Sequence, residues 1–203
     1  MRTTDEYKQL LDPDGKREHY QPIEHPAFRG WRATQPCAER WQMIQECLLD
    51  REQPGVCLDI GCNTGWFSRQ FSRAGWSVVG IDTKSHELEL AASRHMQEFA
   101  GPVLPLYVEG DVAEVNLPSA DVVLCLSMVM YLFNSQFGKT TDQAWAVLQR
   151  IGDAAPMMFL DYGGMYCTLG AGFPGEVLER THYTRCRLLG HTALNRPLYQ
   201  FTR

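Results

Sequence analysis

An apolar run followed by an acid and a glycine-containing turn limits the fold of this chain more than any other feature. Residues 56–60 read VCLDI, residues 61–65 read GCNTG, and a stretch with helical character follows at 66–74. A strand, a tight turn and a helix in this order form a cradle for a small molecule at the carboxyl edge of a parallel sheet. Glycine lets a ligand approach the backbone closely, and the N-terminus of the helix offers free N–H groups. We therefore expect this turn to be a small-molecule binding site.

The same order of strands and helices continues along the chain. Strands are predicted at 56–60, 77–81, 103–108, 121–126 and 157–160, and helices at 38–50, 66–74, 87–100, 141–151 and 174–179. Alternating strands and helices imply a parallel sheet with helices on both faces. The last part differs, because 185–191 and 198–201 read as two strands with no helix between them. The predicted fold class is α/β, a doubly wound and mostly parallel seven-stranded sheet of Rossmann-like type with a terminal antiparallel hairpin.

Two parts of unequal order are expected. Residues 1–37 are polar and interrupted by prolines and glycines, so they are predicted to form a loosely structured arm with one short helix. Residues 38–203 are predicted to form one domain, as is usual for a chain of 203 residues. The arm carries Tyr20, Trp31 and Arg32, and it is a candidate cover for the substrate site.

Three classes of ligand use a strand–turn–helix cradle, and the residues around the glycines separate them. A phosphate-binding P-loop needs Lys and then Ser or Thr after its last glycine, whereas Trp66 and Phe67 follow Gly65. A dinucleotide fingerprint needs three glycines in the pattern G-x-G-x-x-G. Counted from Gly61, the second and third of these positions hold Asn63 and Trp66. The residues therefore fit neither a P-loop nor a dinucleotide-binding turn.

The remaining pattern resembles motif I of the class I S-adenosylmethionine-dependent methyltransferases. It consists of the apolar strand with Asp59 and the turn 61–65, and the resemblance covers roughly residues 38–203. Asp82 ends the next predicted strand, 17 residues after Gly65, where that family has an acid for the ribose hydroxyls. A carboxylate accepts two hydrogen bonds, as binding of a cis-diol requires. Asp111 follows the third predicted strand, where the family often has an acid or an amide near the adenine.

The resemblance implies a set of cofactor-binding residues and no metal ligands. The backbone of the turn would line the methionine part of S-adenosyl-L-methionine, Asp59 would order the turn, and Asp82 would hold the ribose. The implied cofactor-binding residues are Asp59, Gly61, Cys62, Asn63, Gly65, Asp82, Thr83, Asp111, Val112 and Ser127. Asn63 departs from the family, in which many members carry Gly, but Asn is among the residues that tolerate a positive φ. The product would be S-adenosyl-L-homocysteine.

The methyl acceptor leaves no comparable motif. S-adenosylmethionine brings its own reactivity, so the protein mainly has to align a nucleophile. Asp161, after the fifth predicted strand, is the candidate catalytic base or substrate ligand. Tyr131, Tyr162 and Trp31 are candidates for contact with the substrate. The Gly-rich stretch 161–175 is a candidate lid.

Composition narrows the range of partners. A formal net charge of −5 gives no general attraction to phosphate backbones, so nucleic acid is not favoured and a small-molecule substrate is expected. The seven cysteines include no C-x-x-C pair and are interpreted as reduced thiols of a cytoplasmic protein. The longest apolar stretch, 122–133, is too short to span a bilayer, so no membrane partner is expected.

The predicted function is methyl transfer from S-adenosylmethionine to an oxygen or nitrogen of a small or medium-sized acceptor. One alternative is a methyltransferase-like module that binds the cofactor or a partner without catalysis. Another is an enzyme that methylates RNA or a phosphate, because residues 121–127 (DVVLCLS) are similar to the same stretch of methylphosphate-capping RNA methyltransferases. That second resemblance covers seven residues of a core strand, where Val, Leu and Cys recur for packing reasons.

Overall fold

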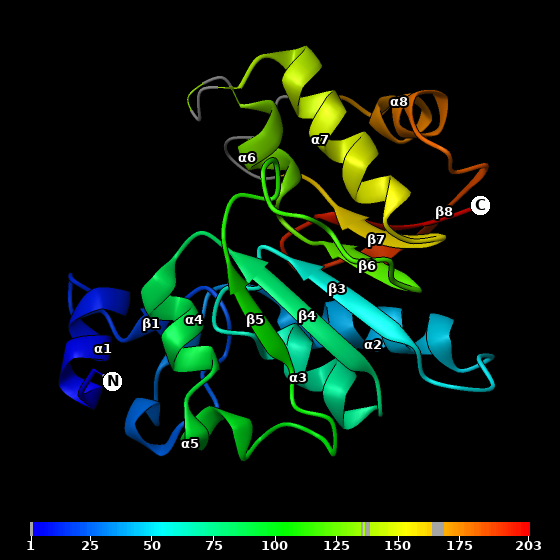
Figure 1. The fold of residues 1–203 in the computed structure, drawn as a ribbon. Helices are drawn as coiled ribbons and strands as arrows, with labels where there is room; N and C mark the ends of the chain where they lie inside the picture. Colours follow the sequence, from blue (N-terminus) through cyan, green and yellow to red (C-terminus); the bar gives the residue numbers. More distant parts are fainter. Residues whose placement is uncertain (1, 135, 137–138, 164–168) are drawn as a thin grey trace.

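The centre of the molecule is a seven-stranded sheet, seen in a computed structural model that describes residues 2–134, 136, 139–163 and 169–203 (Figure 1). The strand order is β5-β4-β3-β6-β7-β9-β8. The strands are β3 (Val56–Ile60), β4 (Ser77–Asp82), β5 (Leu106–Glu109), β6 (Val122–Cys125), β7 (Met157–Asp161), β8 (Arg185–His191) and β9 (Pro197–Thr202). The first five in this spatial order run parallel, and β9 pairs antiparallel with both β7 and β8. The predicted fold class and its terminal hairpin are confirmed.

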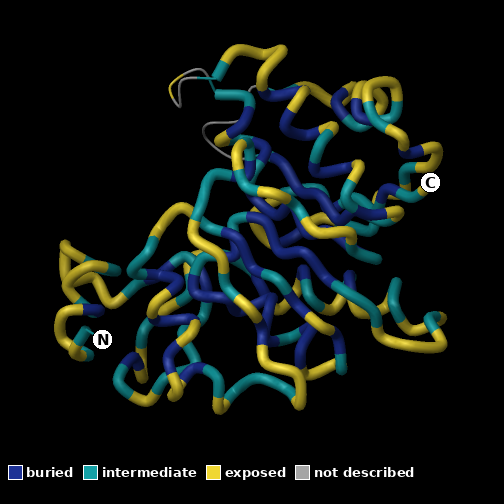
Figure 2. Tube along the Cα trace, viewed as in Figure 1, coloured by how far each residue is buried: buried dark blue, intermediate teal, exposed yellow. Residues whose placement is uncertain are grey.

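Helices cover both faces of the sheet because its inner strands are apolar on both sides. The helices of the domain are α2 (Cys37–Leu48), α3 (Trp66–Arg73), α4 (Ser85–Ala91), α5 (Arg94–Gln97), α6 (Val129–Phe133), α7 (Thr141–Asp153) and α8 (Phe173–Arg180). Leu58 and Ile60 of β3 pack into one core with α6, α7 and α8, whereas Cys57 packs into a second core with α2 and α3. Figure 2 shows the central strands as the most continuously buried part of the chain. This doubly covered sheet holds the loops at its carboxyl edge in fixed positions.

The helix boundaries follow local capping chemistry. Thr140 caps α7 in a capping box with Gln143. The single helix predicted over 87–100 is wrong, because the chain forms α4 and α5 instead. Ser93 accepts a hydrogen bond from the Met96 N–H and so starts the second helix. A serine inside a helical pattern can thus mark a new N-terminus.

Two further elements differ from the prediction. Strand β5 begins at Leu106 rather than at 103, because Pro105 has no N–H to donate to a neighbouring strand. Helix α6 was not predicted at all, since the apolar residues continue from β6 without a Gly or Pro to mark the end of the strand. Three residues separate the helix from that strand, and the helix brings Tyr131 to the carboxyl edge of the sheet.

The N-terminal arm is more ordered than the sequence predicted. It contains α1 (Thr4–Leu11), β1 (Glu18–His19), the 3-10 helix η1 (Pro26–Phe28) and β2 (Arg32–Ala33), and β1 pairs in parallel with β2. Tyr7 and Phe28 are buried against Leu90 and Met96 of α4 and α5. The arm therefore packs on the domain beside α4 (Figure 1). Its apolar residues are too widely spaced in the sequence to show the periodicity by which buried faces are predicted.

Candidate functional site

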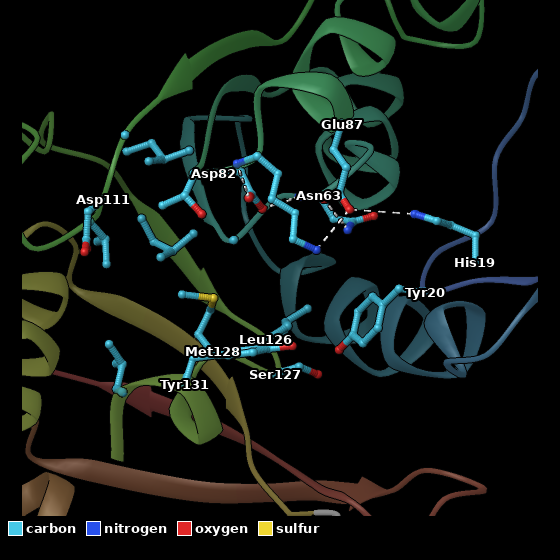
Figure 3. A pocket seen from close by; sticks show the side chains of 18 of the residues that line it. His19, Tyr20, Asn63, Asp82, Glu87, Asp111, Leu126, Ser127, Met128 and Tyr131 are labelled. Carbon is cyan, nitrogen blue, oxygen red and sulfur yellow. Dashed lines mark hydrogen bonds and ion pairs between the residues drawn. The ribbon is translucent and has the colours of Figure 1, made fainter. Parts of the chain in front are cut away.

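A cavity of about 620 Å³ lies at the carboxyl edge of the parallel strands. Its walls come from the loops after β3, β4, β5 and β6 and from the arm, which contributes Glu18, His19, Tyr20 and Thr34 (Figure 3). The sheet has a switch point between β3 and β6. The chain continues from β3 to β4 on one side of this point and from β6 to β7 on the other. Ligands of open α/β sheets bind at this kind of switch point.

The turn after β3 has the backbone conformation that its residues allow. Gly61, Asn63 and Gly65 all have positive φ, of 69°, 53° and 73°. A Cβ at Gly61 would meet the Sδ of Met128 and would also be strained by the positive φ, so glycine is favoured there. The N–H of Trp66 at the start of α3 is taken by Oε1 of Gln21 at 3.0 Å. One of the N–H groups expected to be free at the start of α3 is therefore already bonded within the chain.

Asp82 accepts a backbone hydrogen bond with each of its carboxylate oxygens, one of them from the turn. Oδ2 accepts the N–H of Asn63 at 2.8 Å, and Oδ1 accepts the N–H of Lys84 at 3.1 Å. Burial raises the pKa of Asp82, while these two N–H groups oppose the rise. Each oxygen keeps a further lone pair, so the carboxylate can still accept hydrogen bonds from a ligand in the cavity.

A second carboxylate, Glu87, lies beside the turn and was missed by the sequence analysis. It accepts from Nδ2 of Asn63 at 2.5 Å and from Nζ of Lys84 at 3.2 Å, and its Oε1 lies 3.9 Å from Nε2 of His19 (Figure 3). Burial alone would raise the pKa of Glu87, but the contacts with His19 and Lys84 outweigh it and lower the pKa. We call Asn63, Asp82 and Glu87 the carboxylate side of the cavity.

The loop after β5 contributes a further pair to the wall. Asp111 accepts the N–H of Ala113 at 2.8 Å and forms an ion pair with Lys139 at 3.2 Å, and both contacts lower the pKa of Asp111. Val112 beside it is 5% exposed. This wall therefore presents one ionised carboxylate next to an apolar surface.

The opposite side of the cavity has Ser127 and Tyr20 in its wall, and two arginines contact Ser127 from behind. Ser127, with a φ of 58°, follows β6, and its Oγ accepts from Nη1 of Arg40 and from Nη1 of Arg196, each at 3.1 Å. Nη1 of Arg40 also donates to Asp161 at 2.9 Å, and the N–H of Ser127 donates to the other Asp161 oxygen. We call Arg40, Ser127 and Arg196, together with Tyr20, the arginine side. In Figure 3, the Tyr20 ring lies on this side of the cavity with its hydroxyl toward Ser127.

The structure brings most of the predicted cofactor-binding residues to the cavity. Those that line it are Gly61, Asn63, Asp82, Thr83, Asp111, Val112 and Ser127. Asp59, Cys62 and Gly65 do not line it. Burial raises the pKa of Cys62 well above its ordinary value, so the thiol stays protonated. Gly65 instead forms the N-terminal boundary of α3.

Asp59 lies beneath the turn, where it is 2% exposed. Its Oδ2 accepts the hydroxyl of Ser68 at 2.6 Å. Burial raises the pKa of Asp59 to about 6, and the bond from Ser68 limits the rise. Asp59 therefore orders the turn from below, and it does not contact the cavity.

Of the three candidate substrate residues, one lines the cavity and two lie elsewhere. Tyr131 lines the cavity and is 45% exposed. Tyr162 is instead stacked on Tyr199, and Trp31 packs against Phe28 in the arm. Asp161 is fully buried, and both of its oxygens are engaged by Arg40 and Ser127. These contacts assign Asp161 to holding Arg40 and Ser127 in place. Of the candidate lid, residues 164–168 lie outside the described residues.

Other ligand and partner classes leave few signs in the described part of the chain. None of its clusters of His, Cys, Asp and Glu has the three members that a metal site needs. The six cysteines described carry no disulfide, and Cys167 lies outside the described residues. In the same part of the chain, every helix is too short or too polar to cross a membrane.

Comparisons with known proteins point to one family. A family model described as a methyltransferase domain matches residues 57–152. The O-antigen chain terminator bifunctional methyltransferase/kinase WbdD of Escherichia coli is 26% identical over 199 residues, which cover 90% of this chain and 27% of that protein. Malonyl-acyl carrier protein O-methyltransferase of Pectobacterium atrosepticum is 34% identical over 70 residues, or 34% of this chain and 25% of that protein. The chain thus spans about a quarter of the length of these relatives.

Solved structures share the fold. A crystal structure of WbdD has a TM-score of 0.75 and 21% identity, and the match covers 98% of this chain and 47% of that one. Magnesium protoporphyrin IX methyltransferase from Synechocystis PCC 6803, solved with bound SAM, has a TM-score of 0.65 and 17% identity, and covers 99% and 91% of the two chains. The whole chain, including its arm, is therefore matched by methyltransferase structures.

Proposed function

The chain belongs to the class I S-adenosylmethionine-dependent methyltransferase family, and from this premise we propose that it transfers a methyl group from S-adenosylmethionine to an oxygen or nitrogen of a small or medium-sized acceptor. The observation that carries the proposal is the direct link between the turn and Asp82, in which the Asn63 N–H donates to the Asp82 carboxylate at the cavity wall. The named relatives are methyltransferases as well. Because the chain spans about a quarter of their length, we do not assign the methyl acceptors of these relatives to it.

The residues at the cavity fit this cofactor. A volume of about 620 Å³ lies within the range of pockets for drug-sized ligands. Oδ1 of Asn63 is buried and has no hydrogen-bond partner among the residues described. A buried polar atom of this kind is usually satisfied by a partner, and a bound ligand that donates to it would supply one.

The proposed roles follow from the position of each residue. Bound S-adenosylmethionine supplies an electrophilic methyl group carried by a sulfonium. Asp82 would accept hydrogen bonds from the ribose hydroxyls through its remaining lone pairs. Asp111 and Val112 would flank the adenine, and the backbone at Gly61 would line the methionine part. The carboxylates of Asp82 and Glu87 also give this side negative charge, which favours a cationic ligand.

The arm would cover the bound ligands. His19 and Tyr20 of the arm line the cavity, and Gln21 beside them accepts the N–H of Trp66 at the start of α3. A cover that excludes water strengthens the electrostatic interactions inside the site. We therefore propose that residues 1–37 cover the substrate site and that residues 38–203 form the S-adenosylmethionine-binding methyltransferase domain.

Titration calorimetry with S-adenosylmethionine and S-adenosylhomocysteine tests the proposal. Wild type is expected to bind both, and Asp82→Ala to lose about 1–3 kcal/mol of binding free energy, because a charged acceptor is removed. Asp82→Asn keeps one acceptor and should lie in between. Glu109→Ala is the matched control, since Glu109 pairs with Asp82 in the sheet but is exposed and outside the cavity wall.

Three results would contradict parts of the proposal. If wild type bound neither compound, the proposal that the chain is a methyltransferase would be wrong. Equal losses in Asp82→Ala and Glu109→Ala would remove Asp82 from the ribose role. Binding without release of S-adenosylhomocysteine in the presence of any acceptor tried would favour the binding module without catalysis.

A further inference from the structure

The arginine side of the cavity gathers hydrogen-bond donors around one serine. Oγ of Ser127 accepts from both Arg40 and Arg196, so the hydroxyl hydrogen of Ser127 is left to be donated elsewhere. Ser127 and Tyr20 both line the cavity. The donors come from the arm, from α2, from the loop after β6 and from the hairpin, so the fold brings four separate segments to one place.

The charges in this cluster do not balance. Two guanidinium groups contact Ser127, and Asp161 is the one carboxylate that an ion pair joins to them within the described part of the chain. Arg40 and Asp161, which are 1% and 0% exposed, neutralise each other, whereas the half-buried Arg196 has no ion-pair partner in the described part of the chain. One positive charge is therefore left over beside the cavity.

Several polar atoms of the cluster have no partner in the described part of the chain. They are Oη of Tyr20, Nε of Arg40 and Nε of Arg196, and all three are buried. Burial raises the pKa of Tyr20, so its hydroxyl keeps the proton that it can donate. Buried donors without a partner are rare in proteins, and here they occur together with excess positive charge.

We propose that this side of the cavity, where Tyr20 and Ser127 line the wall and Arg40 and Arg196 contact Ser127 from behind, binds an oxyanion, a carboxylate or a phosphate, that belongs to the methyl acceptor. Guanidinium and hydroxyl donors are the groups that recognise such anions in proteins. The inference rests on the proposed function, because it names the class of acceptor for the same cavity. Asp82 and Asp111, which are assigned to the cofactor, lie across the cavity at the ends of β4 and β5 (Figure 3). The loop after β6 and the hairpin are thereby left for the acceptor.

The same chemistry has a second source, which is the carboxylate of the cofactor itself. The two sources differ in what the arginine side does once the cofactor product is bound. If the anion belongs to the acceptor, an added acid still binds when S-adenosylhomocysteine saturates the protein. If the anion is the cofactor carboxylate, the arginine side is already occupied and its residues determine the affinity for S-adenosylhomocysteine.

The experiment is a calorimetric titration of the full chain with inorganic phosphate and with malonate, in the presence and absence of saturating S-adenosylhomocysteine. Dissociation constants of about 1–10 mM are expected for such small probes, and the stronger of the two identifies a phosphate or a carboxylate site. Tyr20→Phe removes one hydroxyl that makes no internal hydrogen bond among the described residues, and Arg196→Gln removes one half-buried charge. Arg185→Gln is the matched control, an exposed arginine on the same hairpin.

We expect Arg196→Gln to weaken binding of the acid about tenfold or more and Tyr20→Phe about threefold to tenfold, with the affinity for S-adenosylhomocysteine within about twofold of wild type. Arg185→Gln should change neither affinity. Loss of S-adenosylhomocysteine affinity in the two variants would assign the arginine side to the cofactor and overturn the inference. So would acid binding that both variants leave unchanged, or no acid binding by wild type. Absence of S-adenosylhomocysteine binding by wild type would instead overturn the proposed function, and the titrations without it would still decide whether the oxyanion site exists.

Discussion

The carboxylate side and the arginine side of the cavity are assembled in different ways. Asn63, Asp82 and Glu87 lie within 24 residues of one another along the chain. The contacts of the arginine side join residues that are 87, 121 and 69 positions apart. The first side is therefore a local construction around two neighbouring strands, whereas the second forms only when the N-terminal part, two strands and the terminal hairpin have come together.

A buried carboxylate lies beneath each side, and the two carboxylates have different hydrogen-bond partners. Asp59, below the turn, has a neutral partner in Ser68, and its pKa is raised to about 6. Asp161, below the arginine side, has a cationic partner in Arg40. A neutral partner leaves a buried carboxylate sensitive to pH, and a cationic partner makes it dependent on a single side chain. This difference yields separate tests for the two sides.

The largest effect is expected at the arginine side, from Arg40→Met. The substitution keeps an apolar stem of similar length but leaves Asp161 buried without its cation, which costs about 3–5 kcal/mol of unfolding free energy. Urea denaturation followed by circular dichroism measures the loss. The double variant Arg40→Met with Asp161→Asn is the control, because it removes the unpaired charge and should recover much of the stability. A double variant no more stable than the single one would show that Arg40 acts through packing, for instance on Phe67, and not through Asp161.

The contrast between the two sides explains how much the sequence could predict. The turn 61–65 and Asp82 were predicted because a strand end, glycine spacing and an acid at the next strand end are local signals, and both strands were predicted within one residue. Arg40 gave no signal, since an arginine in an amphipathic helix ordinarily reads as a solvated residue, yet it is 1% exposed. Asp161 was singled out for its strand end, but its role depends on that distant arginine. Glu87 lay in a predicted helix, and only the turn beside it shows that it faces the cavity.

A smaller effect, visible in its pH dependence, is expected at Asp59. Its folded pKa of about 6 lies above its ordinary value of 3.8, so the folded protein loses stability as the pH rises from about 4 to about 6 and the buried carboxyl ionises. Asp59→Asn cannot ionise, and it should therefore gain about 2 kcal/mol on wild type between pH 4 and pH 8, whatever its offset at pH 4. Denaturation curves at several pH values measure the gain, with Glu109→Gln reporting the loss of one exposed charge. A constant difference between Asp59→Asn and wild type would mean that Asp59 is ionised throughout.

The smallest effect is expected at the turn itself. Asn63→Gly removes the hydrogen bond from Nδ2 to the buried Glu87 but relieves the cost of a positive φ, so we expect a net loss of about 1 kcal/mol. Asn63→Ala removes the same bond without that relief and should lose about 1 kcal/mol more. Asn195→Gly is the matched control, an exposed asparagine with a φ of 54° and no side-chain bond within the described ranges, and its stability should stay within about 0.5 kcal/mol of wild type. If Asn63→Gly were as stable as Asn195→Gly, the bond to Glu87 would contribute nothing, and the carboxylate side would be held by Asp82 alone.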